Sequence, residues 1–165
     1  MNAPRLDHVS VSCADLDRSI TFYRDVLGLP FLGRGETGGQ DMSAIAGMAD
    51  VQLRWAEFDI GAGQLLELLQ YLSPTGDPLE QRTNRPGSGH IGLAVQDIRA
   101  VHRRLVHHGA TVRSEPVAIQ EAGDWYGVLS MYALDPDGVT IELVQRVPEV
   151  VEIPDLGSKP ANRGR

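Results

Sequence analysis

The sequence lacks the features that would point to a membrane, an oxidising compartment or a nucleic-acid partner. Its single cysteine, Cys13, excludes a disulfide within the chain, and no apolar run approaches the roughly 20 residues that a membrane helix needs. The opening residues "MNAPRLDHVS" show no apolar segment of a secretory signal. The net charge of −7 argues against a polyanionic partner. We therefore expect a cytoplasmic protein that binds neither membrane nor nucleic acid.

What the sequence does contain is an internal repeat. The stretches "DHVSVSCADLDRSI" and "GHIGLAVQDIRAVH" each begin an alternating, strand-like segment with a histidine, His8 or His90. Each histidine is followed seven positions later by an aspartate, Asp15 or Asp97. Both aspartates suit helix N-caps, because a side-chain oxygen there can accept an otherwise unpaired amide hydrogen.

Each half is predicted to fold in the same order. Gly28 and Gly109 suit the ends of the two helices, because glycine tolerates a left-handed closing residue. Apolar residues recur at helical spacing and give each helix one core face: Leu16, Ile20, Tyr23 and Leu27 in the first, and Ile98, Val101 and Leu105 in the second. Strand-like stretches with turns at 61–63 and 135–138 follow. Each half is thus a strand, a helix and about three strands, which is an α+β arrangement.

We expect a single domain over residues 1–165, built from these two modules. Module one covers 6–72 and module two covers 89–146. The residues between them, 73–88, are polar and rich in proline and glycine, as a linker would be. The C-terminal tail, 147–165, is expected to lie over a neighbour or to stay disordered.

Strand periodicity places two histidines and two glutamates on one side of the predicted sheets. Successive side chains on a strand point to opposite faces. His8 and His90 therefore lie opposite the apolar residues of their strands. Glu67 in "GQLLELLQY" and Glu142 in "DPDGVTIELVQ" likewise interrupt apolar runs. If the apolar faces pack on the helices, all four residues line the concave side.

Four such groups would suit a metal ion if they converged. Neighbouring buried carboxylates and imidazoles are costly unless they are paired or coordinated, and one divalent cation satisfies both types. A mixed nitrogen and oxygen set suits manganese, iron, cobalt, nickel or zinc. A single strand histidine more often packs or faces solvent, and a single strand glutamate more often faces solvent. It is the repetition in both halves that favours ligation.

The other histidines and the cysteine have simpler interpretations. His102, His107 and His108 fall on the predicted second helix among arginines, where a solvated face explains them best. Cys13 follows a strand and is expected to be a small packed residue, with a reactive thiol as the alternative.

Four stretches together resemble one protein family. They are "LDHVSVSCADLDRSITFYRDVLGL", "LLELLQY", "GHIGLAVQDI" and "YALDPDGVTIELVQ". Over residues 6–146 the sequence resembles the vicinal oxygen chelate superfamily, which includes glyoxalase I, methylmalonyl-CoA epimerase, extradiol dioxygenases, and fosfomycin and bleomycin resistance proteins. The resemblance implies two βαβββ modules that form a half-open eight-stranded barrel around a metal site. It also implies that His8, Glu67, His90 and Glu142 occupy the four ligand positions.

The resemblance implies chemistry in which adjacent oxygens of a small substrate chelate the metal while a proton moves. Extradiol dioxygenases use two histidines and one carboxylate, so the filled position at Glu67 resembles the glyoxalase I and methylmalonyl-CoA epimerase branch more closely. We therefore expect an isomerase, lyase or epimerase, with Glu142 and Glu67 as candidate bases. A ring-cleaving dioxygenase and a non-catalytic binding or resistance protein are the alternatives.

Substrate contacts and oligomeric state are the last expectations. In epimerases of this superfamily a further acid precedes the third strand, and Asp50 lies near that position. Weak candidates for contact with an anionic or aromatic substrate, for which surface or packing roles are the alternative, are Arg34, Arg54, Trp125 and Tyr126. We expect a homodimer, because a half-open barrel leaves strand edges and apolar surface that need a partner.

Overall fold

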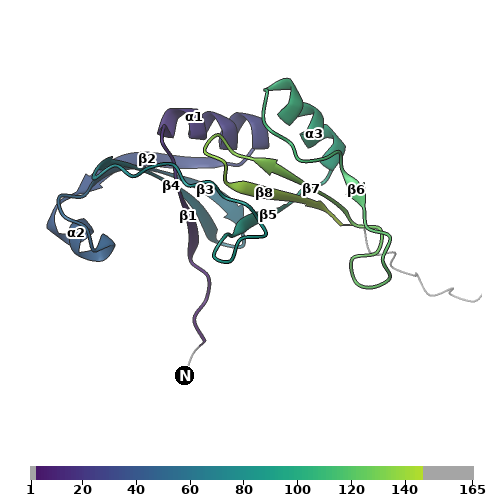
Figure 1. The fold of residues 1–165 in the computed structure, drawn as a ribbon, viewed down its shortest axis with the longest axis horizontal. Coiled ribbons are helices and arrows are strands. Elements are labelled where there is room, and N and C mark those ends of the chain that lie inside the picture. Colours follow the sequence, from purple (N-terminus) through teal and green to yellow (C-terminus); the bar gives the residue numbers. More distant parts are fainter. Residues whose placement is uncertain (1–2, 147–165) are drawn as a thin grey trace, which may run out of the picture.

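One arrangement of strands and helices occurs twice along the chain (Figure 1). The computed structural model describes residues 3–146, so the tail predicted at 147–165 lies outside the described residues. The first half contains β1 (His8–Ser12), α1 (Leu16–Thr21), a π-helical turn η1 (Phe22–Leu27), β2 (Phe31–Gly38), α2 (Gln40–Ala46), β3 (Gln52–Gly61) and β4 (Gln64–Ser73). The second contains β5 (His90–Ala94), α3 (Ile98–His107), β6 (Val117–Ala118), β7 (Leu129–Leu134) and β8 (Thr140–Gln145).

The eight strands form two mixed sheets of four strands each, in the orders β1-β4-β3-β2 and β5-β8-β7-β6. The first and last strands of each half are parallel, and the remaining pairs are antiparallel. Within residues 3–146 no strand pairing joins the two sheets, and the sheets do not close into a barrel. The single eight-stranded half-open barrel implied by the resemblance is therefore present in one chain as two separate sheets.

The predicted helix ends are confirmed. Asp15 accepts a hydrogen bond from the amide of Arg18, and Asp97 accepts one from the amide of Ala100. Gly28 closes the first helical segment with a φ of 85°, a left-handed conformation that costs glycine little. Gly109, with a φ of 70°, follows the end of α3.

The core lies between the helices and one face of both sheets. Figure 1 shows α1 and α3 on the same side of the molecule, above the strands. All seven apolar helix positions predicted from the spacing are buried, and they pack with strand residues that include Phe58, Leu66, Leu68, Ile141 and Leu143. The opposite face of the strands is the one that carries the histidines and glutamates.

Hydrogen bonds join the two modules. The guanidinium of Arg104 on α3 donates to the carbonyl oxygens of Val26 and Leu27, which end the first helical segment. The buried hydroxyl of Tyr23 donates to Asp135 Oδ2 at 2.9 Å. Burial raises the pKa of the Asp135 carboxyl, while the hydrogen bonds that it accepts oppose this rise. Both contacts cross between the modules. One joins α3 to the end of the first helical segment, and the other joins that segment to the turn before β8.

Two local features differ from the expectation. Helix α2 was not predicted, and it exposes most of its surface, with no buried residue. His102 was expected on a solvated face, but it is 9% exposed and lies 3.5 Å from Glu115. His102, like Val101, is buried against the core. The prediction of a solvated face, which was based on the neighbouring arginines, is therefore wrong for His102. His107 and His108 are exposed, as expected.

Among the described residues, no helix is long and apolar enough to cross a membrane.

Candidate functional site

Both sheets hold their histidine and glutamate in the same register. Across β1 and β4, Ser10 pairs with Glu67, and across β5 and β8, Gly92 pairs with Glu142. Each histidine stands two residues before that pairing, on the same face of its strand. The two modules therefore present the same pair of side-chain types at equivalent backbone positions.

In module two the predicted pair is in direct contact. His90 Nε2 lies 3.0 Å from Glu142 Oε2, and the hydroxyl of Ser130 donates to Glu142 Oε1 at 2.9 Å. The Tyr132 ring lies 5.5 Å from the His90 ring, between centroids, and Tyr132 is the cross-strand partner of Glu142. The Glu142 side chain is 19% exposed, so its two oxygens are held in place and remain reachable.

In module one the pair is separated. The hydroxyl of Ser10 donates to Glu67 Oε2 at 2.6 Å, while His8 Nδ1 contacts Asp7 Oδ2 at 2.9 Å. A second carboxylate, Glu57 on β3, is the cross-strand partner of Glu67. The hydrogen bond to Asp7 raises the pKa of His8, and the charges of Glu67, Asp7 and Glu57 raise it further.

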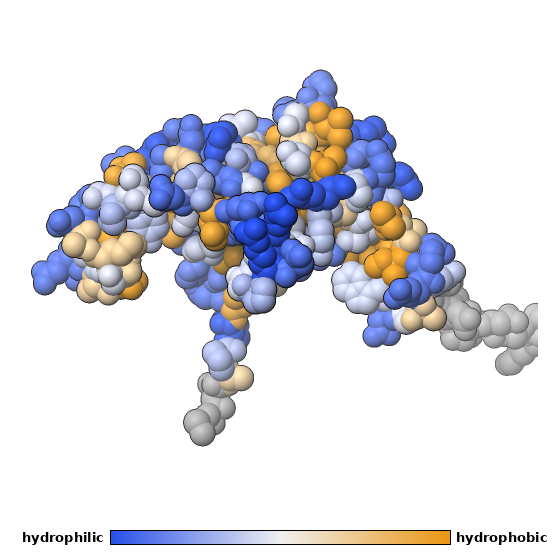
Figure 2. Space-filling view, in the orientation of Figure 1, coloured by the Kyte–Doolittle hydropathy of each residue, from blue (hydrophilic) through white to orange (hydrophobic). Residues whose placement is uncertain are grey.

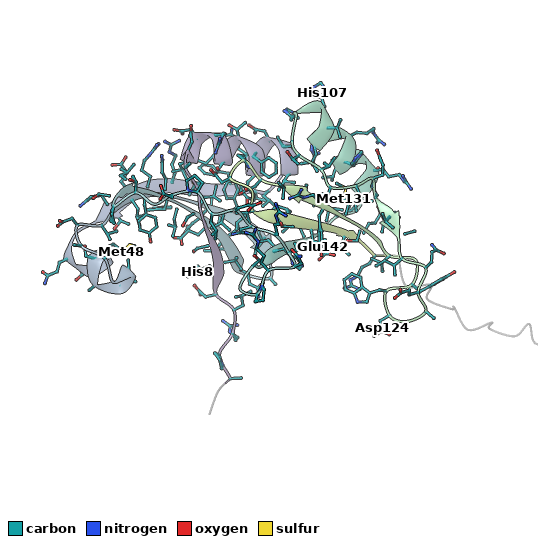
Figure 3. All side chains as sticks on the ribbon, in the orientation of Figure 1. His8, Met48, His107, Asp124, Met131 and Glu142 are labelled. Atoms are coloured by element: carbon teal, nitrogen blue, oxygen red, sulfur yellow. The ribbon has the colours of Figure 1, made fainter. Side chains whose placement is uncertain are left out.

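The four predicted ligands do not meet within one chain. Among residues 3–146, no three histidine, cysteine, aspartate or glutamate side chains are grouped as a metal site requires. The two pairs stay apart because they belong to different sheets. Figure 3 labels one residue of each pair, His8 on β1 and Glu142 on β8. Each sheet brings one histidine and one glutamate to its open face.

The donor chemistry of these faces fits a transition metal. Imidazole nitrogen and carboxylate oxygen together suit manganese, iron, cobalt, nickel and zinc. In module two, the absence of a side chain at Gly92 leaves space beside the Glu142 carboxylate. A Cβ at Gly92 would stand 3.9 Å from Glu142 Oε2, so a larger side chain there would fill the room in front of it.

The structure places Arg54 away from this face. Strand alternation puts Arg54 with Gln70 on the helix-covered side of the sheet, where the two are hydrogen bonded at 3.2 Å. The Asp17 carboxylate on α1 pairs with Arg54 at 3.3 Å and also with Arg34 at 2.5 Å. Both arginines thus link a strand to a helix, and the interpretation of either as a substrate contact is unsupported because Glu67 faces the other way.

The aromatic candidates lie beyond one end of the second sheet. Trp125 and Tyr126 belong to the loop before β7 and are 41% and 63% exposed. The guanidinium of Arg146, which follows β8, lies 4.6 Å from the Trp125 ring centroid. These aromatic residues stay candidates for contact with a substrate. Asp50 precedes β3, as expected, and is exposed.

Sequence reasoning missed the partners of the carboxylates. Ser130 and Tyr132 lie on β7 and Glu57 lies on β3, all on the open faces of the sheets. Counting alternate positions along β3 and β7 in register with β4 and β8 would have found them, because cross-strand partners share a face. The register itself depends on the turn lengths and on the bulges next to the turns.

The comparisons with known proteins agree with this architecture. A family model for the Glyoxalase/Bleomycin resistance protein/Dioxygenase superfamily matches residues 5–143. A solved structure of a glyoxalase family protein from Bacillus cereus superposes with a TM-score of 0.76 at 25% identity, covering 88% of this chain and 95% of that one. The chain belongs to this superfamily, which confirms the family indicated by the sequence motifs.

Two relatives with named activities cover most of the chain. A probable lactoylglutathione lyase of Vibrio parahaemolyticus is 30% identical over 148 residues, which are 88% of this chain and 93% of the relative. A 2-epi-5-epi-valiolone epimerase of Actinomyces sp is 27% identical over 149 residues, covering 86% and 79%. The named relatives thus include a probable lyase and an epimerase.

Proposed function

We propose that the protein is a metal-dependent enzyme that moves a proton on a small substrate whose adjacent oxygens chelate the metal. The observation that carries the proposal is the equivalent register of His8 with Glu67 and of His90 with Glu142 in the two sheets. Relatives named as a lyase and an epimerase support a proton-transfer reaction. The proposed metal is manganese, iron, cobalt, nickel or zinc.

We further propose that two copies of the chain complete each site. The open faces of the two sheets each carry one histidine and one glutamate, and the edge strands β1 and β5 are paired on one side only. A homodimer in which module one of one copy faces module two of the other would bring two histidines and two glutamates together. Such an arrangement would also form the half-open barrel and cover the exposed edges.

In this site the carboxylates have two tasks, ligation and proton transfer. A bound metal would supply a Lewis acid that stabilises negative charge developing on a substrate oxygen. Glu142 and Glu67 are the proposed bases, because a carboxylate held beside the substrate can accept a proton and return it. Ser130 and Ser10 hold one oxygen of each glutamate, which leaves the other oxygen of Glu67 without a hydrogen-bond partner among the described residues.

Solvent exchange tests the reaction class without knowledge of the product. Protein loaded in turn with manganese, iron, cobalt, nickel and zinc is incubated in deuterated buffer with a 2-oxoaldehyde hemithioacetal, a 2-methylacyl thioester or a catechol. Deuterium incorporation next to a carbonyl, followed by NMR, is the expected result. Oxygen uptake with the catechol and no exchange elsewhere would assign a dioxygenase instead. Binding with neither signal would assign a protein that only sequesters its ligand.

Glutamine variants separate the two carboxylate tasks. Glu142→Gln keeps an oxygen ligand but removes the base, so it should retain more metal than His90→Ala while exchange falls by about 100-fold or more. The same pair of measurements on Glu67→Gln shows which module provides the base. If both glutamine variants exchange at the wild-type rate, neither glutamate moves the proton.

Mixing two defective variants tests the shared site. His8→Ala and His90→Ala each damage one module, so a mixed dimer would contain one intact site and one doubly damaged site. After subunit exchange, metal content should rise from near zero to about a quarter of the wild-type value, since about half of the dimers are mixed. No recovery, with subunit exchange confirmed by mass, would place all four ligands of a site in one chain.

A further inference from the structure

A pocket lies between the linker and the open face of the second sheet. Its volume is about 720 Å³, and its walls include residues 79–84 of the linker together with Arg113, Tyr132 and Thr140. Figure 2 shows hydrophilic atoms gathered in the middle of the molecule, where Figure 1 draws the linker. The linker therefore forms one side of a polar pocket.

This pocket adjoins the pair of candidate ligands in module two. Thr140 stands two residues before Glu142 on the same strand, and Tyr132 is the cross-strand partner of Glu142. Tyr132 also contacts the pair from the pocket side, because its ring centroid is 5.5 Å from that of His90. A small molecule with one end at His90 and Glu142 would pass Tyr132 and place its other end in the pocket.

Two carboxylates and two guanidinium groups line the pocket, and both carboxylates are already paired with arginines. Glu80 accepts hydrogen bonds from both Arg82 and Arg85, at 2.7 and 3.1 Å, so two guanidinium groups share one carboxylate. The Asp137 carboxylate is already engaged by Arg18 at 2.7 Å. Arg113 lines the same pocket and has no ion pair among residues 3–146. Its guanidinium is available for a planar oxyanion.

An unsatisfied acceptor lies in the same wall. Gln81 lines the pocket, and its side-chain oxygen Oε1 is buried without a hydrogen-bond partner in the described structure. A buried acceptor without a donor costs free energy, and such groups are uncommon in folded proteins. A ligand that carries a hydroxyl or N–H group would supply the missing donor once a rotation of the Gln81 side chain turns this oxygen into the pocket.

We propose that this pocket binds the polar end of the substrate, a carboxylate or phosphate that also bears a hydroxyl or N–H donor. Arg113 binds the oxyanion, Gln81 accepts from the donor, and Tyr132 separates this end from the reacting end. The assignment rests on the proposed function only in placing the reacting end at His90 and Glu142. The substrate class is then an anionic, hydrogen-bonding small molecule rather than an uncharged or purely aromatic one.

The test uses the metal-free full chain, so that it needs neither metal nor turnover. L-malate, succinate and inorganic phosphate are titrated in low-salt HEPES buffer at pH 7, and binding is followed by backbone amide NMR spectra. We expect saturable shifts around Arg113, Tyr132 and the linker, with a Kd on the order of 1 mM. The tighter of the carboxylate and phosphate probes identifies the oxyanion. Malate should bind more tightly than succinate, because it offers a hydroxyl to Gln81.

Matched variants decide between a site and a general effect of charge. Arg113→Gln should weaken malate binding by about tenfold or more, whereas Arg103→Gln, which removes the same charge from an exposed face of α3, should not change it. Gln81→Leu should abolish the preference for malate over succinate. Shifts elsewhere, no saturation, or equal weakening by both arginine variants would overturn the proposal. Malate binding in a protein that neither binds metal nor exchanges protons would overturn the proposed function instead and leave the pocket assigned.

Discussion

The two modules share a backbone register and differ in what surrounds it. In module two, His90 touches Glu142 directly and the Tyr132 ring lies opposite the glutamate. In module one, His8 turns to Asp7, and a second carboxylate, Glu57, lies opposite Glu67. A repeated strand pattern therefore reproduces backbone positions without reproducing the contact between the histidine and the glutamate.

The outer strands differ as well. Module one has a long β2 (Phe31–Gly38) followed by helix α2, whereas module two has a β6 of two residues, Val117–Ala118. In module two the pocket beside the open face is instead closed by the linker. Module one thus has a long outer strand and a helix, where module two has a short outer strand and a pocket bounded by the linker.

The largest expected effect is a loss of metal affinity when either histidine is replaced. Comparing the two variants tests whether both modules provide metal ligands. His8→Ala and His90→Ala should each lower metal affinity by more than about 100-fold, because each removes a proposed nitrogen ligand. Exposed His107 on α3 provides the control, and His107→Ala should bind metal normally. Elemental analysis and competition with a chromogenic chelator measure the affinity. Loss in only one of the two variants would mean that the shared register does not reflect a shared role.

Removing a serine hydroxyl should lower metal affinity less than removing a histidine, and by different amounts in the two modules. Ser10→Ala and Ser130→Ala each remove a hydrogen bond that orients a glutamate, and losses of about tenfold in metal affinity are expected for such partners. Ser10→Ala should lose more, because Glu142 also contacts His90. Ser12→Ala, on the same face of β1, is the control, and an equal loss there would point to a general change in the strand.

The turns before the last strands offer a comparison of stability. Tyr23→Phe removes a buried hydrogen bond to Asp135 in module two and should lower the free energy of unfolding by about 1–2 kcal/mol. Asp59 accepts a similar turn bond from Gly61 in module one, but it is exposed. Asp59→Ala should therefore cost about 0.5 kcal/mol or less. Urea unfolding measures both, and equal costs would contradict the role assigned to burial.

The effect that is smallest at neutral pH appears only in alkaline solution and comes from Cys13, whose place in module two is taken by Val95. Burial raises the pKa of the Cys13 thiol from 9.0 to about 11. As pH rises from about 9 toward 11, the unfolded thiol loses its proton first, so the free energy of unfolding falls. Cys13→Val should show a shallower fall between pH 9 and 10 and the wild-type slope below about pH 8. Identical slopes above pH 9 would show that the thiol ionises alike in both states.

Much of the local structure could be predicted from short patterns. The caps at Asp15 and Asp97, the helix end at Gly28 and the buried helix positions follow from neighbouring residues, because capping and helical spacing act over three or four positions. The burial of His102 was not predictable in the same way. It depends on which side of α3 the sheet covers, and the nearby arginines gave the opposite impression.

In the candidate site too, some features follow from the local sequence and others only from the tertiary structure. Strand alternation alone placed His8, Glu67, His90 and Glu142 on one kind of face, because the side-chain period of a strand is a local property. Only the tertiary structure decided that the two pairs lie in separate sheets, that Arg54 faces a helix, and that the linker closes a pocket beside Tyr132. Those outcomes depend on strand order, register and packing between segments far apart in the chain, which no short stretch of sequence specifies.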